Sequence, residues 1–181
     1  MEKLSPIQEL YQEIEKQQLW CKTLVLPRNG YLKTGGTLDT NLYYVVSGSL
    51  KIFVQDEGTE NIIRFGYPQD FIAALDSFIA EKQSPLFIQT IKKTTLSVIE
   101  KKVFIDFIQQ CDKHKKLWDA IQQSLLLQQI EREIDLLTSS PKDRYERVYL
   151  RSPQLFQEIP ARYIASYLRM SPETLSRLKK T

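Results

Sequence analysis

Between Leu24 and Ile99 the hydrophobic pattern has a period of two residues, and this segment limits the fold more than any other. Short runs rich in β-branched and aromatic residues alternate with turn signals such as Gly35-Gly36 and Ser47-Gly48. Many short strands at near-regular spacing are typical of an antiparallel sandwich, barrel or roll. The predicted strands are Leu24–Leu26, Leu42–Val46, Leu50–Val54, Ile62–Phe65, Phe87–Ile91 and Leu96–Ile99.

The alternation is clearest in the third of these runs. Side chains point to opposite faces of a sheet at successive positions of a strand. Leu50, Ile52 and Val54 are therefore expected to face one way, and Lys51 and Phe53 the other.

On both sides of this segment the period is that of a helix. Ser5-Pro6-Ile7-Gln8 is a capping box with proline at the first helical position, and it predicts a helix over residues 5–18. After Glu100 the apolar residues return to helical spacing, which predicts a short helix closing the β domain and a longer one from about Asp112 to Thr138. The short helix is supported by Val103, Phe104, Phe107 and Ile108.

The longer helix has apolar residues on two faces. One face is expected to pack on the β domain, with Leu125 and Leu126 supplying a second apolar face. A stripe left exposed on a long helix favours the same helix of a second chain as its partner. The alternative is a helix buried against its own domain. The predicted interface residues are Leu117, Ile121, Leu127, Ile130, Ile134 and Leu137.

The last predicted elements are two short amphipathic helices within Ile159–Lys180, joined by a tight turn. Ile164, Ala165 and Leu168 share one face of the first helix. The second begins at Ser171-Pro172-Glu173, where serine suits the N-cap and glutamate favours the helix dipole. This pattern predicts a helix-turn-helix, whose second helix can enter the DNA major groove. The alternative is an ordinary helical hairpin with a solvated charged face.

Charge supports the helix-turn-helix. The net charge of the chain is +3, but residues 141–181 contain nine Lys or Arg and four Asp or Glu, a net of +5. A basic end on a nearly neutral body is the electrostatic pattern of a nucleic-acid-binding module.

Several other classes of protein are disfavoured by the remaining residues. Cys21 and Cys111 lack metal-binding spacing and are interpreted as reduced thiols. His114 lies in a charged Asp-Lys-His-Lys-Lys run and is expected at the surface. Neither a membrane-spanning run nor a signal-peptide hydrophobic region is present, so we expect a cytoplasmic protein.

Taken in order, these elements resemble the Crp/Fnr family of bacterial transcription regulators over essentially the whole chain. The resemblance implies an α+β fold with an N-terminal antiparallel β-roll (a jelly-roll like the cyclic-nucleotide-binding domain), a dimerisation helix and a DNA-reading helix-turn-helix. The implied domains are 1–111, 112–138 and 139–181. It also implies double-stranded DNA, a second copy of the chain and RNA polymerase as partners. The motifs that carry it lie at residues 33–37, 41–51, 67–72, 163–168 and 171–177.

In nucleotide-binding relatives, the strand matching Phe71-Ile72 precedes Gly-Glu, and an arginine follows a short helix. Backbone N–H groups and that arginine hold the cyclic phosphate, and the glutamate accepts from the ribose. Here those positions are Ala73, Ala74 and about Ser84. We therefore expect a degenerate pocket that does not bind cyclic AMP or cyclic GMP in the usual manner. A more apolar effector and a pocket without any ligand are the two remaining interpretations.

No cofactor, metal site or catalytic site is predicted. An iron–sulfur cluster needs four cysteine ligands, and the chain has two. Gly30–Thr37 superficially mimics a phosphate-binding loop, but Gly36 replaces the required lysine and no helix follows. An enzyme is thus the weakest hypothesis.

The DNA-reading element departs from the family pattern twice. Arg169 occupies the turn position where glycine is usual, at a cost of about 1 kcal/mol in left-handed geometry, and it is a candidate phosphate contact. The sequence ends at Thr181, directly after the second helix. The two interpretations are a short, wingless form and a truncated piece of a longer chain. A wingless form is expected to have weaker non-specific affinity.

The sequence therefore predicts a homodimeric regulator that reads a pseudo-palindromic operator. Glu173 and Arg177 are expected to contact bases. The rival hypothesis is a small-molecule sensor or interaction module whose helix-turn-helix does not bind DNA. Predicted phosphate contacts are Arg169, Ser171, Thr174, Lys179 and Lys180.

Overall fold

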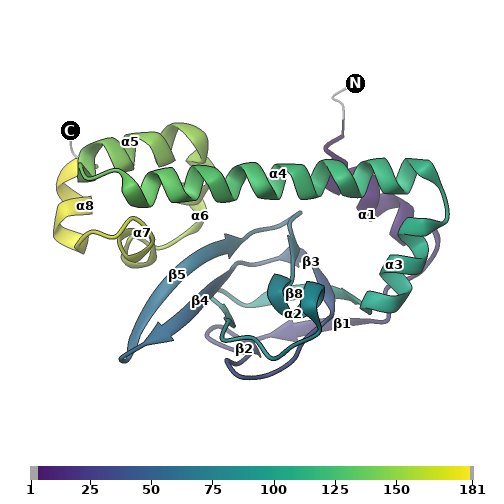
Figure 1. Ribbon diagram of the computed structural model, residues 1–181. Helices are drawn as coiled ribbons and strands as arrows, with labels where there is room; N and C mark the ends of the chain where they lie inside the picture. Colours follow the sequence, from purple (N-terminus) through teal and green to yellow (C-terminus); the bar gives the residue numbers. More distant parts are fainter. Residues whose placement is uncertain (1–3, 180–181) are drawn as a thin grey trace.

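The computed structural model describes residues 4–179 and contains a β-roll, a long helix along it and a group of short helices at one end (Figure 1). This arrangement confirms the predicted fold class. The elements before the long helix are α1 (Pro6–Lys16), β1 (Lys22–Leu26), β2 (Tyr31–Lys33), β3 (Leu42–Ser47), β4 (Leu50–Asp56), β5 (Thr59–Gly66), β6 (Phe71–Ile72), α2 (Leu75–Ala80), β7 (Phe87–Thr90) and β8 (Thr94–Ile99). Those that follow are α3 (Lys101–Gln109), α4 (Asp112–Leu137), α5 (Pro141–Arg151), α6 (Pro153–Glu158), α7 (Ala161–Tyr167) and α8 (Pro172–Leu178).

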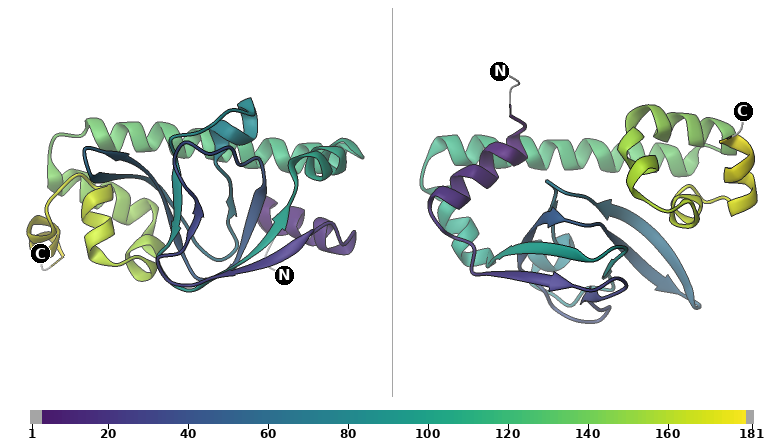
Figure 2. Two further views of the ribbon diagram at one scale, coloured as in Figure 1. Left: turned by 90° about the horizontal axis from the view of Figure 1, so that it is seen from below. Right: turned by 180° about the vertical axis from the view of Figure 1, so that it is seen from behind.

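The roll consists of two four-stranded antiparallel sheets, ordered β1-β8-β3-β6 and β2-β7-β4-β5. Figure 2 shows the two layers from below and from behind. The space between them is filled by apolar side chains, including Val45, Leu50, Ile88 and Leu96, each fully buried. Gly48 makes the turn between β3 and β4 at φ +91°, where an added Cβ would lie 2.4 Å from the Lys93 carbonyl oxygen. Only glycine fits a backbone approach this close.

The hairpin β4–β5 is buried on both faces, which the alternation in the sequence did not predict. Leu50 and Ile52 face the roll interior as expected. Phe53 faces the other way, also as expected, but it is buried there in a cluster with Ile62 and Phe65 of β5. A register shift between Ile52 and Phe53 leaves Ile63 as the extra residue of a β-bulge.

The outer face of this hairpin packs against the C-terminal helices. Their buried residues form one continuous cluster with Phe53, Ile62 and Phe65, and Ile91 joins it from the end of β7. The helical domain therefore shares a core with the roll. The helical members of the cluster are Val148, Leu155, Ile159, Ile164, Ala165, Leu168 and Leu175.

The long helix α4 packs on α1 and α3 at its N-terminal end and carries the C-terminal helices at the other (Figure 1). Ile121 is 3 % exposed inside this chain's own core.

His114, expected at the surface, is buried. Its ring stacks on Phe107 at 4.1 Å, and its Nδ1 lies 3.0 Å from the Phe107 carbonyl oxygen. The charged run around it misled the prediction because only His114, one of its five residues, faces inward.

The helix caps follow the sequence signals closely. The Ser5 hydroxyl accepts from the Gln8 N–H while the Gln8 side chain accepts from the Ser5 N–H, which is the predicted capping box. Ser140 and Ser171 cap α5 and α8 through the hydroxyl alone, which accepts from the N–H of Asp143 and of Thr174. Sequence analysis missed β2 and α6. In α3, Val103 is exposed although Phe104, Phe107 and Ile108 are buried.

No helix within residues 4–179 combines the length and apolar character that crossing a membrane requires.

The shared cluster generates a stability prediction. Phe53→Ala removes a ring that is 1 % exposed between the hairpin and the C-terminal helices. We expect a loss of about 3–5 kcal/mol of unfolding free energy, measured by urea denaturation. Val25→Ala, at a side chain 56 % exposed on the roll, is the control and should change stability by about 0.5 kcal/mol or less. A Phe53→Ala protein as stable as the control would show that the cluster does not hold the two parts together.

Candidate nucleic-acid interface

The second helix of the predicted helix-turn-helix is α8, and its N-terminus is built by local sequence. Ser171 at the N-cap accepts a hydrogen bond from the Thr174 N–H at 3.2 Å. Pro172 occupies the first helical position, where a missing N–H costs nothing. Leu175, 1 % exposed, anchors the helix to the core formed with α7. The opposite face of α8 is left toward solvent.

That outward face carries the residues predicted to contact DNA. Ser171, Glu173, Arg177 and Lys179 are exposed, and Thr174 is half-buried. Glu173 and Arg177 are four residues apart and so lie on one face of the helix. Lys180 lies outside the described residues. Local hydrogen bonds from the Glu173 N–H and the Ser171 side chain lower the pKa of the Glu173 carboxyl, which keeps it an acceptor at neutral pH.

Arg169 has the left-handed backbone expected at the turn, with φ +53°. Its side chain turns toward the roll, where Nη1 donates to Asn61 Oδ1 of β5 at 2.7 Å. Its carbonyl oxygen accepts from Arg144 at 3.2 Å. In this structure Arg169 therefore holds the turn against the hairpin rather than presenting its guanidinium to a phosphate.

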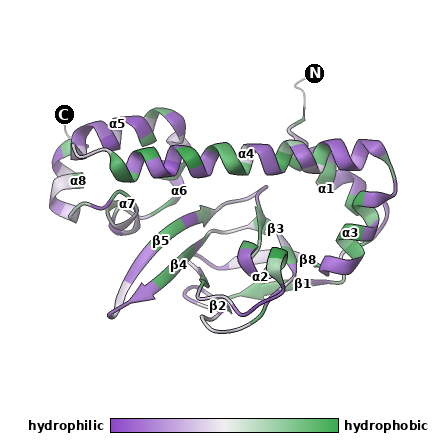
Figure 3. Cartoon of the chain, in the orientation of Figure 1, coloured by the Kyte–Doolittle hydropathy of each residue, from purple (hydrophilic) through white to green (hydrophobic). Residues whose placement is uncertain are grey.

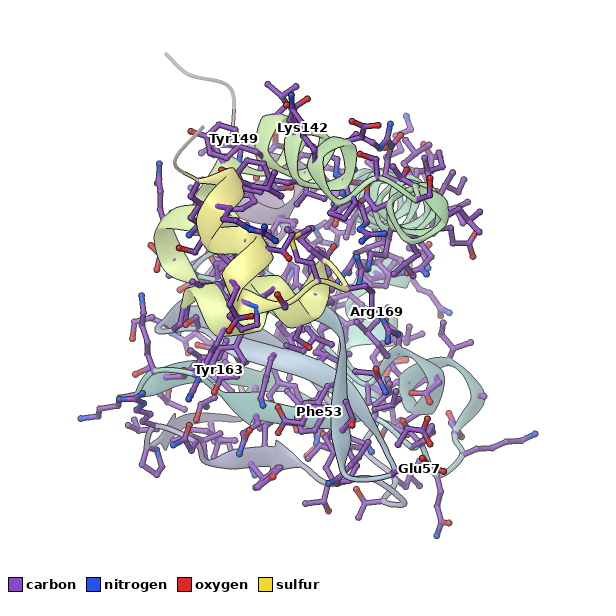
Figure 4. The ribbon with its side chains drawn as sticks, turned by 90° about the vertical axis from the view of Figure 1, so that its left-hand side faces the viewer. Phe53, Glu57, Lys142, Tyr149, Tyr163 and Arg169 are labelled. Carbon is purple, nitrogen blue, oxygen red and sulfur yellow. The ribbon has the colours of Figure 1, made fainter. Side chains whose placement is uncertain are left out.

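Tyr163 and Arg169 both lie where the C-terminal helices meet the hairpin that carries Phe53 and Glu57 (Figure 4). The hairpin contributes Lys51, whose side chain is 2 % exposed and forms an ion pair with Glu60. The Lys51 Nζ also lies 4.8 Å from the centre of the Tyr163 ring, a cation–π distance. Ser166 of α7 donates to the Glu60 carbonyl oxygen at 3.2 Å. The first helix of the motif is thus docked on the roll by polar as well as apolar contacts.

Some basic residues of the C-terminal segment form ion pairs or hydrogen bonds within the chain, and others extend into solvent. Arg147 and Arg151 of α5 form ion pairs with Glu131 and Asp135 of α4, and the Asp135 side chain is fully buried. Arg144 donates to the carbonyl oxygen of Thr138 at 2.7 Å, as well as to that of Arg169. These three arginines fasten α5 to α4, so the sequence count overstated the charge available to a nucleic acid. Sequence analysis missed this role because nothing in the local pattern pairs the two helices.

The residues of the predicted effector pocket lie inside the roll and at its edge. Ala73 is 5 % exposed, Ala74 and Ser84 are fully buried, and Phe71 packs edge-on against Tyr44 at 5.4 Å. The Ser84 hydroxyl accepts from the Leu86 N–H at 3.0 Å, and its carbonyl oxygen accepts from the Gly36 N–H at 2.8 Å. Apolar side chains and paired backbone groups thus fill the positions of a phosphate clamp.

Lys33 is a buried cation at this place that sequence analysis did not find. Its side chain is 4 % exposed, and its Nζ donates to the carbonyl oxygens of Thr34, Ser84 and Leu86 at 3.0, 3.1 and 2.9 Å. All three N–H donors of the ammonium are used. Burial lowers the Lys33 pKa, and the negative charges of Asp76 and Asp39 partly oppose this. Lys33 could not bind a phosphate without giving up one of these bonds.

Comparison with known proteins agrees with this architecture. Residues 23–111 match the family described as the cyclic nucleotide-binding domain. No curated protein sequence matches the chain significantly.

Solved structures of similar fold extend the likeness over the remaining helices. FixK2 from Bradyrhizobium japonicum has 16% identity and a TM-score of 0.72, with 88% of this chain and 82% of that chain covered. The c-di-GMP-responsive global regulator CLP of Xanthomonas campestris has 18% identity and a TM-score of 0.69, covering 94% and 90%. A regulator assigned to the crp/fnr family from Eubacterium rectale has 17% identity and a TM-score of 0.68, covering 94% and 84%.

Proposed function

We propose that this chain, whose roll belongs to the cyclic nucleotide-binding domain family and whose fold is that of the Crp/Fnr regulators, is a DNA-binding transcription regulator. The observation that carries the proposal is the outward face of α8. It presents Glu173 and Arg177 together on a helix whose other face is anchored by Leu175. A helix supported from behind and exposed in front has the geometry needed to enter a major groove.

The proposed division of labour follows from side-chain chemistry. Arg177 would donate two hydrogen bonds to a guanine edge, and Glu173 would accept from a cytosine amino group. Ser171, Thr174 and Lys179, with Lys180, would hold phosphates. Arg162 of α7 is a further exposed cation, and its Nη2 donates to the Tyr163 hydroxyl at 2.6 Å. Arg169 would join the phosphate contacts only if its bond to Asn61 opened.

The proposed regulator is a homodimer through α4, with RNA polymerase as a further partner. Leu127, Ile130, Ile134 and Leu137 are spaced three, four and three residues apart and are all exposed. This is the spacing of a coiled-coil seam. Figure 3 shows hydrophobic patches along this helix. Ile121 is not part of the proposed dimer interface, because it is buried in the core of its own chain. Leu117 is partly buried against the same core.

The predicted domains, 1–111, 112–138 and 139–181, are kept in this proposal as functional units. The first would be the sensor, the second the dimerisation helix and the third the DNA-binding domain. Their shared core means that the third would not be expected to act independently of the first.

A second candidate function is an interaction module that does not bind DNA. It is favoured by the observation that Arg144, Arg147, Arg151 and Arg169 all bond to this chain's own groups. Fewer free cations mean fewer phosphate contacts and a shallower salt dependence of binding. Measuring binding to double-stranded DNA over a range of salt concentrations separates the two functions.

The base-reading assignment predicts different results for two substitutions on α8. The operator should be a pseudo-palindrome with half-site centres about 34 Å, or about 10 base pairs, apart. Arg177→Ala should weaken binding to a selected operator by about 1–3 kcal/mol and relax the preference at one base pair per half-site. Lys179→Ala should weaken all sequences alike and flatten the salt dependence.

Lys142→Ala is the matched control, because Lys142 pairs with Glu146 on α5 and lies off the α8 surface. Fluorescence anisotropy with selected and random duplexes measures all three variants. Equal weakening of both duplexes by Arg177→Ala would make Arg177 a phosphate contact and contradict the assignment.

The dimer interface predicts that Ile130→Lys with Ile134→Lys gives a monomer, because like charges replace apolar side chains at the seam. Sedimentation velocity measures the change. Val25→Lys, at an exposed apolar residue of the roll, should leave the dimer intact. If the double variant still dimerises, the interface lies elsewhere.

The degenerate cassette predicts that the protein does not respond to cyclic nucleotides. Ala73, Ala74 and Ser84 offer no anion clamp, and the donors of Lys33 are already used. Calorimetric titration with cyclic AMP and cyclic GMP should show no saturable heat at submillimolar concentration. Saturation in the micromolar range would refute the prediction.

A further inference from the structure

A cavity of about 570 Å³ lies between the roll, α4 and the helices α5 and α6. It is within the size range of small-molecule sites. Its walls come from β5 and β6 on one side and from α4 on the other, and Leu155 of α6 helps to close one end. Ala74, Ser84 and Lys33 are not among its lining residues, but Phe71 and Ala73 are, so the cavity adjoins the degenerate nucleotide cassette on the side that faces α4.

One end of the cavity is cationic. Arg132 of α4 is 6 % exposed, and its Nη2 donates to the Tyr167 carbonyl oxygen at 2.6 Å. Its Nη1 is buried and has no hydrogen-bond partner among the described residues. Leaving a buried charged donor unpaired is costly, so the site gains from any group that accepts from it. Arg64 of β5 lines the same end and donates to Gln128 Oε1 at 3.1 Å.

The charged side chains at this end have a net positive charge that one bound anion would balance. Arg151, the third arginine of the lining, is already paired with Glu131 and Asp135. Asp70 is the carboxylate of the lining, and it accepts from the Tyr67 N–H at 3.0 Å. Burial raises the Asp70 pKa, although Tyr67 and Arg64 lower it. The two cations Arg64 and Arg132 therefore line the cavity with a single carboxylate, that of Asp70.

The other end of the cavity is apolar. Trp118, Ile121 and Leu125 line it from α4, and Phe71 lines it from β6. From Trp118 to Arg132 the helix advances fourteen residues, or about 21 Å. The cavity is thus elongated, with a hydrophobic wall leading to a desolvated guanidinium.

We propose that this cavity binds an amphipathic carboxylate, with its acidic head on Arg132 and Arg64 and its alkyl chain along Leu125 and Ile121 toward Trp118. This inference goes beyond the proposed function and holds whether or not the chain binds DNA. Because the walls belong to the roll, to α4 and to α5–α6, the ligand stabilises the docked arrangement of the C-terminal helices by mass action.

The first experiment compares three probes by calorimetric titration below their aggregation concentrations. Dodecanoate has both the acidic head and the chain, dodecan-1-ol has the chain alone, and acetate has the head alone. We expect saturable binding of dodecanoate, dodecanol weaker by about tenfold or more, and no saturation with acetate. Equal affinity for dodecanoate and dodecanol, or no saturation with dodecanoate, overturns the proposal.

Two variants test whether the ligand binds in the cavity. Arg132→Gln should weaken dodecanoate about tenfold or more while leaving dodecanol unchanged. Since Arg132 also supports Tyr167, Ile63→Trp provides an independent test that fills the cavity from a half-exposed bulge position. Ile79→Trp, at a side chain 73 % exposed on α2 and outside the cavity lining, is the control. Unchanged binding to Ile63→Trp would place the ligand on another apolar surface and refute the site.

The orientation is tested by fluorescence quenching in a Trp20→Phe background, which leaves Trp118 as the single tryptophan. Bromine quenches tryptophan at short range, so 12-bromododecanoate should quench Trp118 strongly and 2-bromododecanoate weakly at equal saturation. Equal quenching by both, or the reverse order, contradicts a head group at Arg132.

Discussion

The arrangement of this protein depends on the burial of hairpin β4–β5 on both faces. Leu50 and Ile52 fill the roll, whereas Phe53, Ile62 and Phe65 form one core with the C-terminal helices. A sheet face normally presented to water has become an internal surface, and the hydrophobic gain is large because several apolar side chains are removed from solvent together. The position of α7, and through it of α8, is therefore set by the roll rather than by a flexible connection.

Arginine side chains of α5 add polar contacts to those of the apolar cluster. Arg147 and Arg151 hold α5 to α4 through Glu131 and a fully buried Asp135, and Arg144 joins two backbone turns. A fully buried carboxylate such as Asp135 is costly unless it is paired, so removing Arg147 or Arg151 would leave Asp135 less well compensated. These ion pairs and hydrogen bonds fix the angle between α4 and α5. It also reduces the positive charge that the C-terminal helices can offer to DNA.

The shared apolar core and the arginine contacts connect the cavity to the α8 surface. Arg132 lies at the junction, with its guanidinium 3.7 Å from the centre of the Tyr167 ring at the end of α7. Its Nη1 has no hydrogen-bond partner within residues 4–179, and Arg132 lines the cavity. A ligand there would touch the same elements that position the reading helix. The roll interior offers no comparable link, because Lys33 and the backbone around Ser84 satisfy one another. We therefore infer that an effector would bind where the roll meets α4 and the C-terminal helices, next to Phe71 and Ala73 of the degenerate cassette.

Local sequence determined the parts of this protein that depend on neighbouring residues. Period-two runs predicted most of the strands, and serine–proline caps predicted the starts of α1 and α8. The spacing of Glu173 and Arg177 predicted their common face. Tertiary structure alone decided which surfaces meet. A lysine in a strand, a histidine in a charged run and an arginine on a long helix carry no local sign of burial, yet Lys51, His114 and Arg132 are all enclosed. Their partners lie on other elements, so a pattern read along one element could not reveal them.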